Sequence, residues 1–173
     1  MEHAYWGAQV SNGEAIDFFR SAGVRYEKFE KADRLLDRVV DLIRQGKVIG
    51  WLQGRFEWGP RALGNRSILA DPRNPQMKEI VNRKIKFREP FRPFAPSVLA
   101  QEARNYFDLP ESALLPARFM LVVPPVRQEG RGRIPAVTHV DGTCRLQMVE
   151  ESVNPYYAAL IQRFGRPRAF PCS

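Results

Sequence analysis

Glycine and arginine alternate along residues 54–66, directly after an apolar stretch of the chain, in a pattern suited to binding anions. The glycines Gly54, Gly59 and Gly64 stand at intervals of five residues, and the arginines are Arg55, Arg61 and Arg66. Glycine lets a ligand approach the backbone closely. The flat, permanently charged guanidinium of arginine fits phosphate or carboxylate. The segment therefore predicts a site for a phosphorylated or anionic small molecule, although the phosphate-binding Gly-x-x-x-x-Gly-Lys-Ser/Thr motif is absent. A surface loop whose arginines pair with Glu57 and Asp71 is the alternative.

A second cationic segment follows, with Lys84, Lys86, Arg88 and Arg92 interleaved with Ile85, Phe87, Phe91 and Phe94. Three prolines at 90–96 predict an extended or turning segment. Alternation along an extended backbone places cations on one face and apolar groups on the other, which favours the lining of a basic pocket. Two alternatives stay open: a solvated run of charges, and a surface that binds RNA through stacking and phosphate contacts.

His139 and Asp141 flank a predicted tight turn, with Thr143 and Arg145 close behind. In the functional interpretation, His139 and Arg145 face the same anion. In the alternative, the aspartate and threonine only cap the backbone of a turn. The chain has two histidines and no Cys-x-x-Cys, so we expect no transition-metal site.

The composition predicts a globular protein with an anionic partner. The chain has 173 residues, enough for one domain with a proper core, and its net charge is +8. No apolar run approaches the roughly 20 residues that span a bilayer. The beginning of the chain does not resemble a secretion signal, and Cys144 and Cys172 form no disulfide pattern. We therefore expect a cytoplasmic location, with Cys144 buried as a small apolar side chain.

Periodicity and turn residues predict the elements that would position these groups. Helices are expected at 14–22, 33–45, 75–84, 101–107 and 155–164, with Asp33 capping the second of them. Strands are expected at 47–53, 97–99, 119–123, 136–140 and 143–149, the last two forming a hairpin around Asp141 and Gly142. The segments 109–118 and 127–133 are expected to be a loop and a turn. This mixture favours an α/β or α+β domain with one sheet.

Residues 54–67 read Gly-Arg-Phe-Glu-Trp-Gly-Pro-Arg-Ala-Leu-Gly-Asn-Arg-Ser and resemble the signature of NodU/CmcH-type O-carbamoyltransferases. Residues 68–73, 82–97 and 137–143 fit the same family in the same order, and the resemblance covers roughly residues 4–165. The part that matches is the C-terminal, YrdC-like domain of that family. The resemblance implies an α/β fold with a twisted mixed sheet and flanking helices, as a single domain over 1–165 followed by a divergent tail at 166–173.

The resemblance also implies a reaction. The YrdC-like domain would convert ATP and carbamoyl phosphate to carbamoyl adenylate, with Mg²⁺ as a candidate companion ion. An actin-like domain holding a metal ion, in cis or in trans, would then pass the carbamoyl group to a hydroxyl acceptor.

Carried over by position, the resemblance implies that Arg61, Lys86 and Arg92 hold the phosphates and the carbamoyl adenylate, with Arg145 as a further anion contact. Together with the patterns above, this predicts Lys86, Arg92 and His139 as catalytic residues. It predicts Arg55, Arg61, Arg88 and Arg145 as nucleotide- or substrate-binding residues, and no metal site. Lys86-Phe87-Arg88 resembles the Lys-x-Arg half of the YrdC signature. Cations of this kind would neutralise charge that develops on a transferring acyl phosphate.

The chain departs from the family pattern in two ways. It lacks the actin-like domain, and after Gly165 it lacks the strand and Ser-x-Asn segment that complete the nucleotide site. We therefore expect a truncated domain that does not complete carbamoyl transfer alone. The competing hypotheses are a basic module for structured RNA, a threonylcarbamoyl-adenylate synthase-like protein, and a remnant that only docks on a partner.

Overall fold

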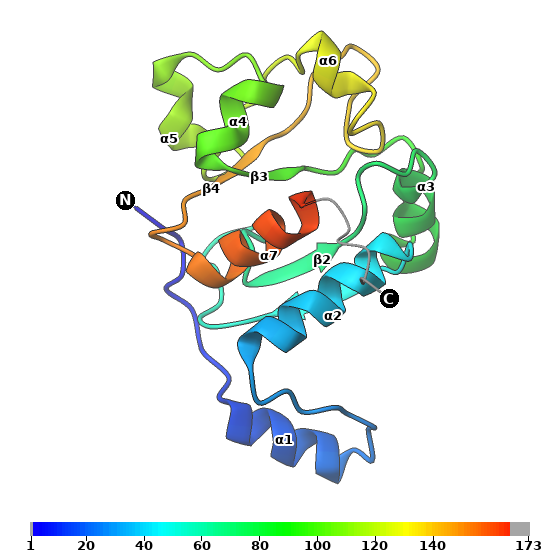
Figure 1. Ribbon diagram of the computed structural model, residues 1–173, viewed down its shortest axis with the longest axis vertical. Coiled ribbons are helices and arrows are strands. Elements are labelled where there is room, and N and C mark those ends of the chain that lie inside the picture. Colours follow the sequence, from blue (N-terminus) through cyan, green and yellow to red (C-terminus); the bar gives the residue numbers. More distant parts are fainter. Residues whose placement is uncertain (1, 167–173) are drawn as a thin grey trace, which may run out of the picture.

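The computed structural model describes residues 2–166, which form a small mixed α/β domain with two two-stranded sheets (Figure 1). The single sheet expected from the sequence is therefore wrong for this part of the chain, and the YrdC-like twisted sheet stays a prediction. Most of the tail predicted at 166–173 lies outside the described residues. Among residues 2–166, no helix combines the length and apolarity needed to cross a membrane.

The first helix, α1 (Asn12–Ser21), stands apart from the rest of the domain (Figure 1). Ser11 and Glu14 form a reciprocal capping box, in which the Ser11 hydroxyl accepts from the Glu14 amide and the Glu14 carboxylate accepts from the Ser11 amide. None of its ten residues is buried by the described part of the chain. Local capping therefore supports this helix more than packing does.

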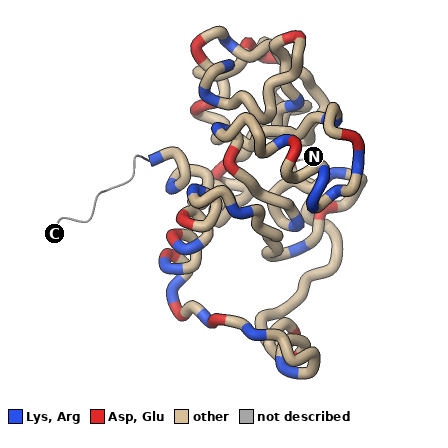
Figure 2. Tube along the Cα trace, turned by 90° about the vertical axis from the view of Figure 1, so that its right-hand side faces the viewer, with Lys and Arg blue, Asp and Glu red and all other residues tan. Residues whose placement is uncertain are grey.

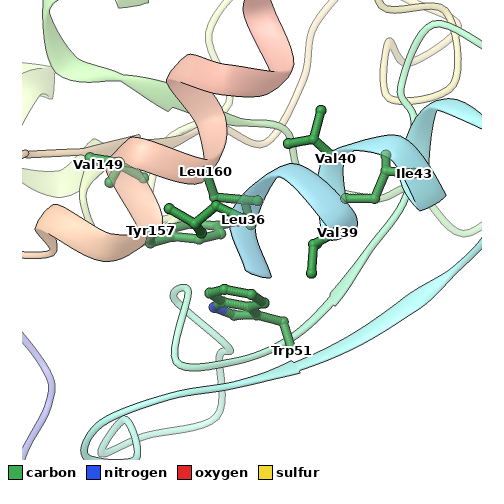
Figure 3. Packing of buried hydrophobic residues seen from close by; sticks show 9 residues of the cluster. Leu36, Val39, Val40, Ile43, Trp51, Val149, Tyr157 and Leu160 are labelled. Atoms are coloured by element: carbon green, nitrogen blue, oxygen red, sulfur yellow. The ribbon is translucent and has the colours of Figure 1, made fainter. Parts of the chain in front are cut away.

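Helices α2 (Ala32–Arg44) and α7 (Pro155–Gly165) lie side by side and form one core with the first sheet (Figures 1 and 3). The buried members of this core are Leu36, Val39, Val40, Ile43, Trp51, Val149, Tyr157, Ala158 and Leu160. The predicted capping role of Asp33 is wrong, because Lys31 is the N-cap residue and the Asp33 carboxylate binds Arg163 of α7. Asp33 thus ties the two helices together.

The first sheet pairs β1 (Ile49–Leu52) antiparallel with β2 (Arg66–Leu69), with Trp51 opposite Ser67. The second sheet pairs β3 (Ser97–Leu99) parallel with β4 (Gln147–Val149). Four short helices accompany the second sheet: α4 (Ala100–Tyr106), η2 (Glu111–Ala113), α5 (Leu114–Ala117) and α6 (Gln128–Arg131). Their core includes Phe107, Leu146 and Cys144, and burial raises the pKa of the Cys144 thiol to about 12. Burial of Cys144 confirms the prediction.

Two predicted strands are wrong, and so is the predicted hairpin. Residues 119–123 follow α5 as a turn in which Met120 adopts a left-handed backbone (φ 55°), incompatible with a strand. Residues 136–140 also form turns, and only Gln147–Val149 of the expected strand 143–149 is β structure. Pro124 and Pro125 lack amide N–H groups, so the contact with Thr143 is limited to an isolated bridge. The expected loop 109–118 and turn 127–133 instead contain η2, α5 and α6.

Helix α3 (Met77–Val81) continues directly into a π-helical turn, η1 (Asn82–Lys86). The cationic segment therefore begins in a helical turn at Lys84 and Lys86, and its remainder folds into a turn, one of the two forms that its prolines predicted. Met77 and Val81 pack against Ala136, which fixes the segment 134–143 beside α3. This small cluster positions the His139 turn near the cationic segment.

We expect Gly64→Ala to lower the free energy of unfolding more than Gly59→Ala, although both glycines have the same backbone conformation (φ 107° and 108°). The left-handed backbone alone costs about 1–3 kcal/mol for a non-glycine residue. A Cβ at Gly64 would also overlap the Tyr157 ring, whereas one at Gly59 meets no described atom within 4 Å. The extra cost at Gly64 is about 1–3 kcal/mol. Urea unfolding followed by circular dichroism measures both, and equal losses would contradict this packing.

Candidate functional site

Glu57 is the centre of the glycine–arginine loop that joins β1 to β2. Its side chain is fully buried, and Oε1 accepts hydrogen bonds from the amides of Leu63 (2.6 Å), Asn65 (2.8 Å) and Arg66 (3.3 Å). The Arg66 Nε atom lies 3.1 Å from Oε2. A single carboxylate thus holds the second half of the loop in place.

This geometry changes how the loop can bind an anion. Consecutive backbone amides in glycine-rich loops often form a concave anion site. Here the amides of residues 63, 65 and 66 face Glu57, and the Gly64 amide donates to Ser67 Oγ (3.0 Å). A ligand at this loop would therefore meet side chains rather than these amides. Of the pairings that the surface-loop alternative predicts, Glu57 with Arg66 is present, whereas Asp71 binds Arg73.

Buried amide side chains join this loop to the rest of the domain. Asn154, at the N-terminus of α7, donates to Asn65 Oδ1 (2.8 Å) and Tyr5 Oη (2.9 Å). Gln53 Nε2 donates to the Oδ1 atoms of both asparagines, at 3.1 and 3.0 Å. Gln147 of β4 donates to the Leu63 carbonyl at 2.7 Å. The network therefore connects the N-terminal segment, the loop, α7 and the second sheet.

Arg55 and Arg61 both lie in this loop, next to the N-terminal segment. Arg55 is exposed and donates to the Gly7 carbonyl at 3.3 Å. Arg61 is half-buried, and its Nε is fully buried without a hydrogen-bond partner among the described residues. Of the two, Arg61 has a guanidinium with unused donor capacity close to the domain interior.

Asn82 organises the second cationic segment. It is fully buried and donates from Nδ2 to the carbonyls of Pro90 (3.2 Å) and Arg92 (3.0 Å), while Oδ1 accepts from Arg88 Nε (2.7 Å). The Arg88 guanidinium also stacks over Phe94 at 4.7 Å from the ring centre. One buried amide therefore folds residues 82–92 into a compact turn.

This turn surrounds an open hollow of about 620 Å³. Its lining consists of Arg83, Phe87, Arg88, Glu89 and Arg92. Arg92 pairs with Glu89 at 2.8 Å, whereas Arg88 pairs with no carboxylate within residues 2–166. Burial, followed by the charge of Arg92, lowers the pKa of Arg88. The guanidinium groups therefore repel one another, and a bound anion would relieve this repulsion.

The apolar half of the expected alternation is wrong at Ile85, Phe87 and Phe91, and only Phe94 packs against a core cluster. Phe87 is 84% exposed and Phe91 is 73% exposed, so their rings cover no core. Phe87 also has a left-handed backbone (φ 47°), which is rare for an aromatic residue. Lys86, directly before it, is exposed at the end of the π-helical turn.

The His139 turn lies beside α3. His139 Nδ1 is 3.0 Å from Thr143 Oγ1, which in turn donates to Asp141 Oδ1 at 2.7 Å. The Thr143 amide donates to the same carboxylate oxygen at 3.0 Å, as the capped-turn alternative predicts. Burial lowers the pKa of His139; Asp141 opposes this shift, and Lys78 and Arg145 add to it. The structure thus brings His139 near the exposed Arg145.

The residues that the sequence singled out fall into two groups. Arg55 and Arg61 belong to the loop between β1 and β2, where Arg55 contacts the N-terminal segment. In the other group, Arg88 and Arg92 line the hollow that follows α3, and Lys86 ends η1. Ala136 packs against α3 and so places the turn of His139, whose pKa Arg145 affects, beside the same helix.

Sequence reasoning missed two residues that shape these groups: Arg83 lines the hollow, and Asn82 folds its backbone. It named Phe87 and Thr143 without these roles: Phe87 lines the hollow, and Thr143 connects Asp141 to His139. Arg83 belongs to the same run of cations, so counting charge alone could have included it. Nothing in the local pattern indicates that Asn82 is buried. Within residues 2–166 there is no cluster of three metal-ligating side chains of the His, Cys, Asp and Glu types.

Fold and site together define a basic α/β domain with a cluster of arginine and lysine side chains after α3. The sequence model described as carbamoyltransferase C-terminus matches residues 40–172. The chain therefore belongs to this carbamoyltransferase family, a family of transferases.

Curated relatives agree with the family match. The chain is 44% identical to the nodulation protein NolNO of Sinorhizobium fredii over 171 residues, which covers 99% of the chain and 25% of the relative. It is 43% identical to the nodulation protein NolO of Bradyrhizobium diazoefficiens, covering 99% and 31%. It is 38% identical to nodulation protein U of Rhizobium tropici, covering 96% and 26%. The chain thus spans between a quarter and a third of the length of these relatives.

We expect Glu57→Gln to destabilise the domain by about 1–3 kcal/mol, because the buried loop amides lose a charged acceptor and Arg66 loses its partner. Glu89→Gln is the matched control. Glu89 also pairs with an arginine, but its side chain is 54% exposed and its ion pair is screened by solvent, so its loss should cost much less. Urea unfolding measures both variants, and a Glu57→Gln variant as stable as the control would overturn the role of Glu57.

Proposed function

We propose that this chain is the part of an O-carbamoyltransferase that binds ATP and carbamoyl phosphate and forms carbamoyl adenylate. Membership of the carbamoyltransferase family supports the assignment of a carbamoyl group as the group that is transferred. The observation that carries the proposal is the hollow lined by Arg83, Arg88 and Arg92, where Arg88 has no carboxylate partner among residues 2–166 and burial and the charge of Arg92 lower its pKa.

The charge of this region suits the proposed substrates. Residues 83–92 contain five cations and one carboxylate. ATP, carbamoyl phosphate and the adenylate all carry phosphate charge, which fixed cations stabilise as it redistributes during transfer. We assign the phosphate contacts to Lys86, Arg88 and Arg92. The exposed Phe87 ring at the edge of the hollow offers a surface on which a nucleotide base can stack.

The remaining steps would take place outside this chain. We propose that an actin-like domain, in cis or in trans, holds its own metal ion and passes the carbamoyl group to a hydroxyl acceptor. Mg²⁺ would reach the present domain together with the nucleotide, bound mainly through phosphate oxygens. A cytoplasmic location would supply ATP.

RNA binding is the less favoured alternative. Lys and Arg are spread along the whole trace rather than gathered on one segment (Figure 2). A continuous basic face would suit a long polyanion better. A threonylcarbamoyl-adenylate synthase-like function is less favoured because the family match is to carbamoyltransferases.

We expect calorimetric titration of the chain to show saturable ATP binding that carbamoyl phosphate and Mg²⁺ strengthen. Lys86→Ala and Arg92→Ala should each weaken binding by about 1–3 kcal/mol, the size of a lost hydrogen bond to a charged group. Arg104→Ala on α4 is the control, because this exposed arginine pairs with Glu111 away from the hollow. Arg61→Ala tests whether the β1–β2 loop contributes to the same site.

The results separate the alternatives. Unchanged ATP affinity in both Lys86→Ala and Arg92→Ala would show that the hollow is not part of the binding site. Absence of ATP binding by a folded chain, together with tight and strongly salt-dependent binding of RNA, would favour the RNA-binding function instead.

A further inference from the structure

The side chains of Asp141, Thr143 and His139 form a chain of hydrogen bonds in which every proton can be placed. Hydrogen bonds to the Thr143 amide and hydroxyl lower the pKa of Asp141, so near neutral pH its carboxylate is ionised and only accepts. The Thr143 hydroxyl has one proton, and it donates this proton to Asp141 Oδ1. Toward His139, the Thr143 oxygen can therefore act only as an acceptor.

This assignment fixes the tautomer of His139. Its Nδ1 lies 3.0 Å from the Thr143 oxygen, so Nδ1 carries the proton and donates it. In the neutral ring, Nε2 then holds a lone pair. This Nε2 is buried and has no hydrogen-bond partner among residues 2–166. The turn therefore holds a buried acceptor that no described residue uses.

The surroundings keep the ring neutral and the turn rigid. Burial and the cations Lys78 and Arg145 oppose protonation of His139, and the lowered pKa reflects this. Gly142 has φ 79°, and a Cβ there would overlap the Arg131 guanidinium that packs against the turn. A neutral acceptor thus stands among cations, an arrangement that fits a ligand with an N–H donor attached to an anion.

We propose that His139 Nε2 accepts a hydrogen bond from the amino group of a carbamoyl ligand, and that Asp141 and Thr143 are positioning residues that hold this tautomer. The inference rests on the proposed function and adds the basis of acyl specificity to it. Lys78 and Arg145 would add to the attraction of Lys86, Arg88 and Arg92 for the phosphate of carbamoyl phosphate, while the amino group meets Nε2. Acetyl phosphate has the same shape with a methyl group in place of the amino group, so it gains no hydrogen bond at Nε2 and binds more weakly.

The tautomer can be measured without any ligand. Imidazole ¹⁵N chemical shifts distinguish the two tautomers, and the chain contains only His3 and His139, so His3→Gln assigns the signals. We expect the Nδ1-protonated form near neutral pH. Asp141→Asn should preserve it, because the amide oxygen still accepts both Thr143 bonds. Asp141→Ala frees the Thr143 hydroxyl to donate to Nδ1 and should populate the Nε2-protonated form. An Nε2-protonated ring in the unsubstituted chain would overturn the inference.

Acyl specificity is the second readout. Calorimetric titrations in the presence of ATP should show that the chain binds carbamoyl phosphate at least about tenfold more tightly than acetyl phosphate. His139→Phe and Asp141→Ala should reduce this ratio to near one, while Asp141→Asn should retain it. A purely structural role would weaken both ligands equally and leave the ratio unchanged, which would contradict the inference.

The two readouts separate failure of this inference from failure of the proposed function. If the chain binds both acyl phosphates equally and His139 has the expected tautomer, the acceptor role fails while the anion site stands. If a folded chain binds neither acyl phosphate nor ATP, the proposed function fails, and the specificity inference that depends on it fails too.

Discussion

The buried polar network around Glu57 and Asn154 is the constraint on which the rest of the domain depends. Each sheet has only two strands, and such small sheets are marginal without further support. Glu57 holds the β1–β2 loop through three amides, and Asn154 connects that loop to Tyr5 and α7. Gln147 adds a bond from β4 to the same loop. Because unsatisfied polar groups are costly inside a protein, the network stabilises one arrangement of these elements.

The cationic region around α3 is built on a different principle. Asn82 satisfies the hydrogen-bonding groups of its own turn, because it bonds to the carbonyls of Pro90 and Arg92 and to Arg88. The arginines therefore line the hollow and are not drawn into the core. The packed core of the domain can thus support a cationic region in which Arg88 and Arg92 repel each other. Binding sites often hold like charges whose repulsion a ligand relieves. The stability of the packed core offsets the free-energy cost of that repulsion. The His139 turn, fixed beside α3 by Ala136, adds a neutral acceptor to these cations.

Sequence patterns predicted helices and strands correctly where a single local signal specifies the element. Helical periodicity placed α2 and α7, and an apolar run before glycine placed β1. The same reasoning failed at 119–123, where β-branched and aromatic residues suggested a strand. There the chain is leaving α5, and Met120 turns it with a positive φ. Strand pairing depends on a partner at long sequence separation, and no local pattern specifies that partner.

For the site, the sequence alone determined the chemical groups that are available. These are the run of arginines and lysines, the glycine–arginine segment 54–66, the turn at Asp141 and Gly142, few histidines, and the resemblance to O-carbamoyltransferases. Only the tertiary structure decided which of these groups meet. It directed the loop amides that follow Arg61 toward Glu57 rather than toward a ligand. It also set the proton on His139 Nδ1 through Thr143. Residue types fix charge and donor capacity, whereas distance and burial, which decide whether that capacity is already used, arise only when remote segments pack together.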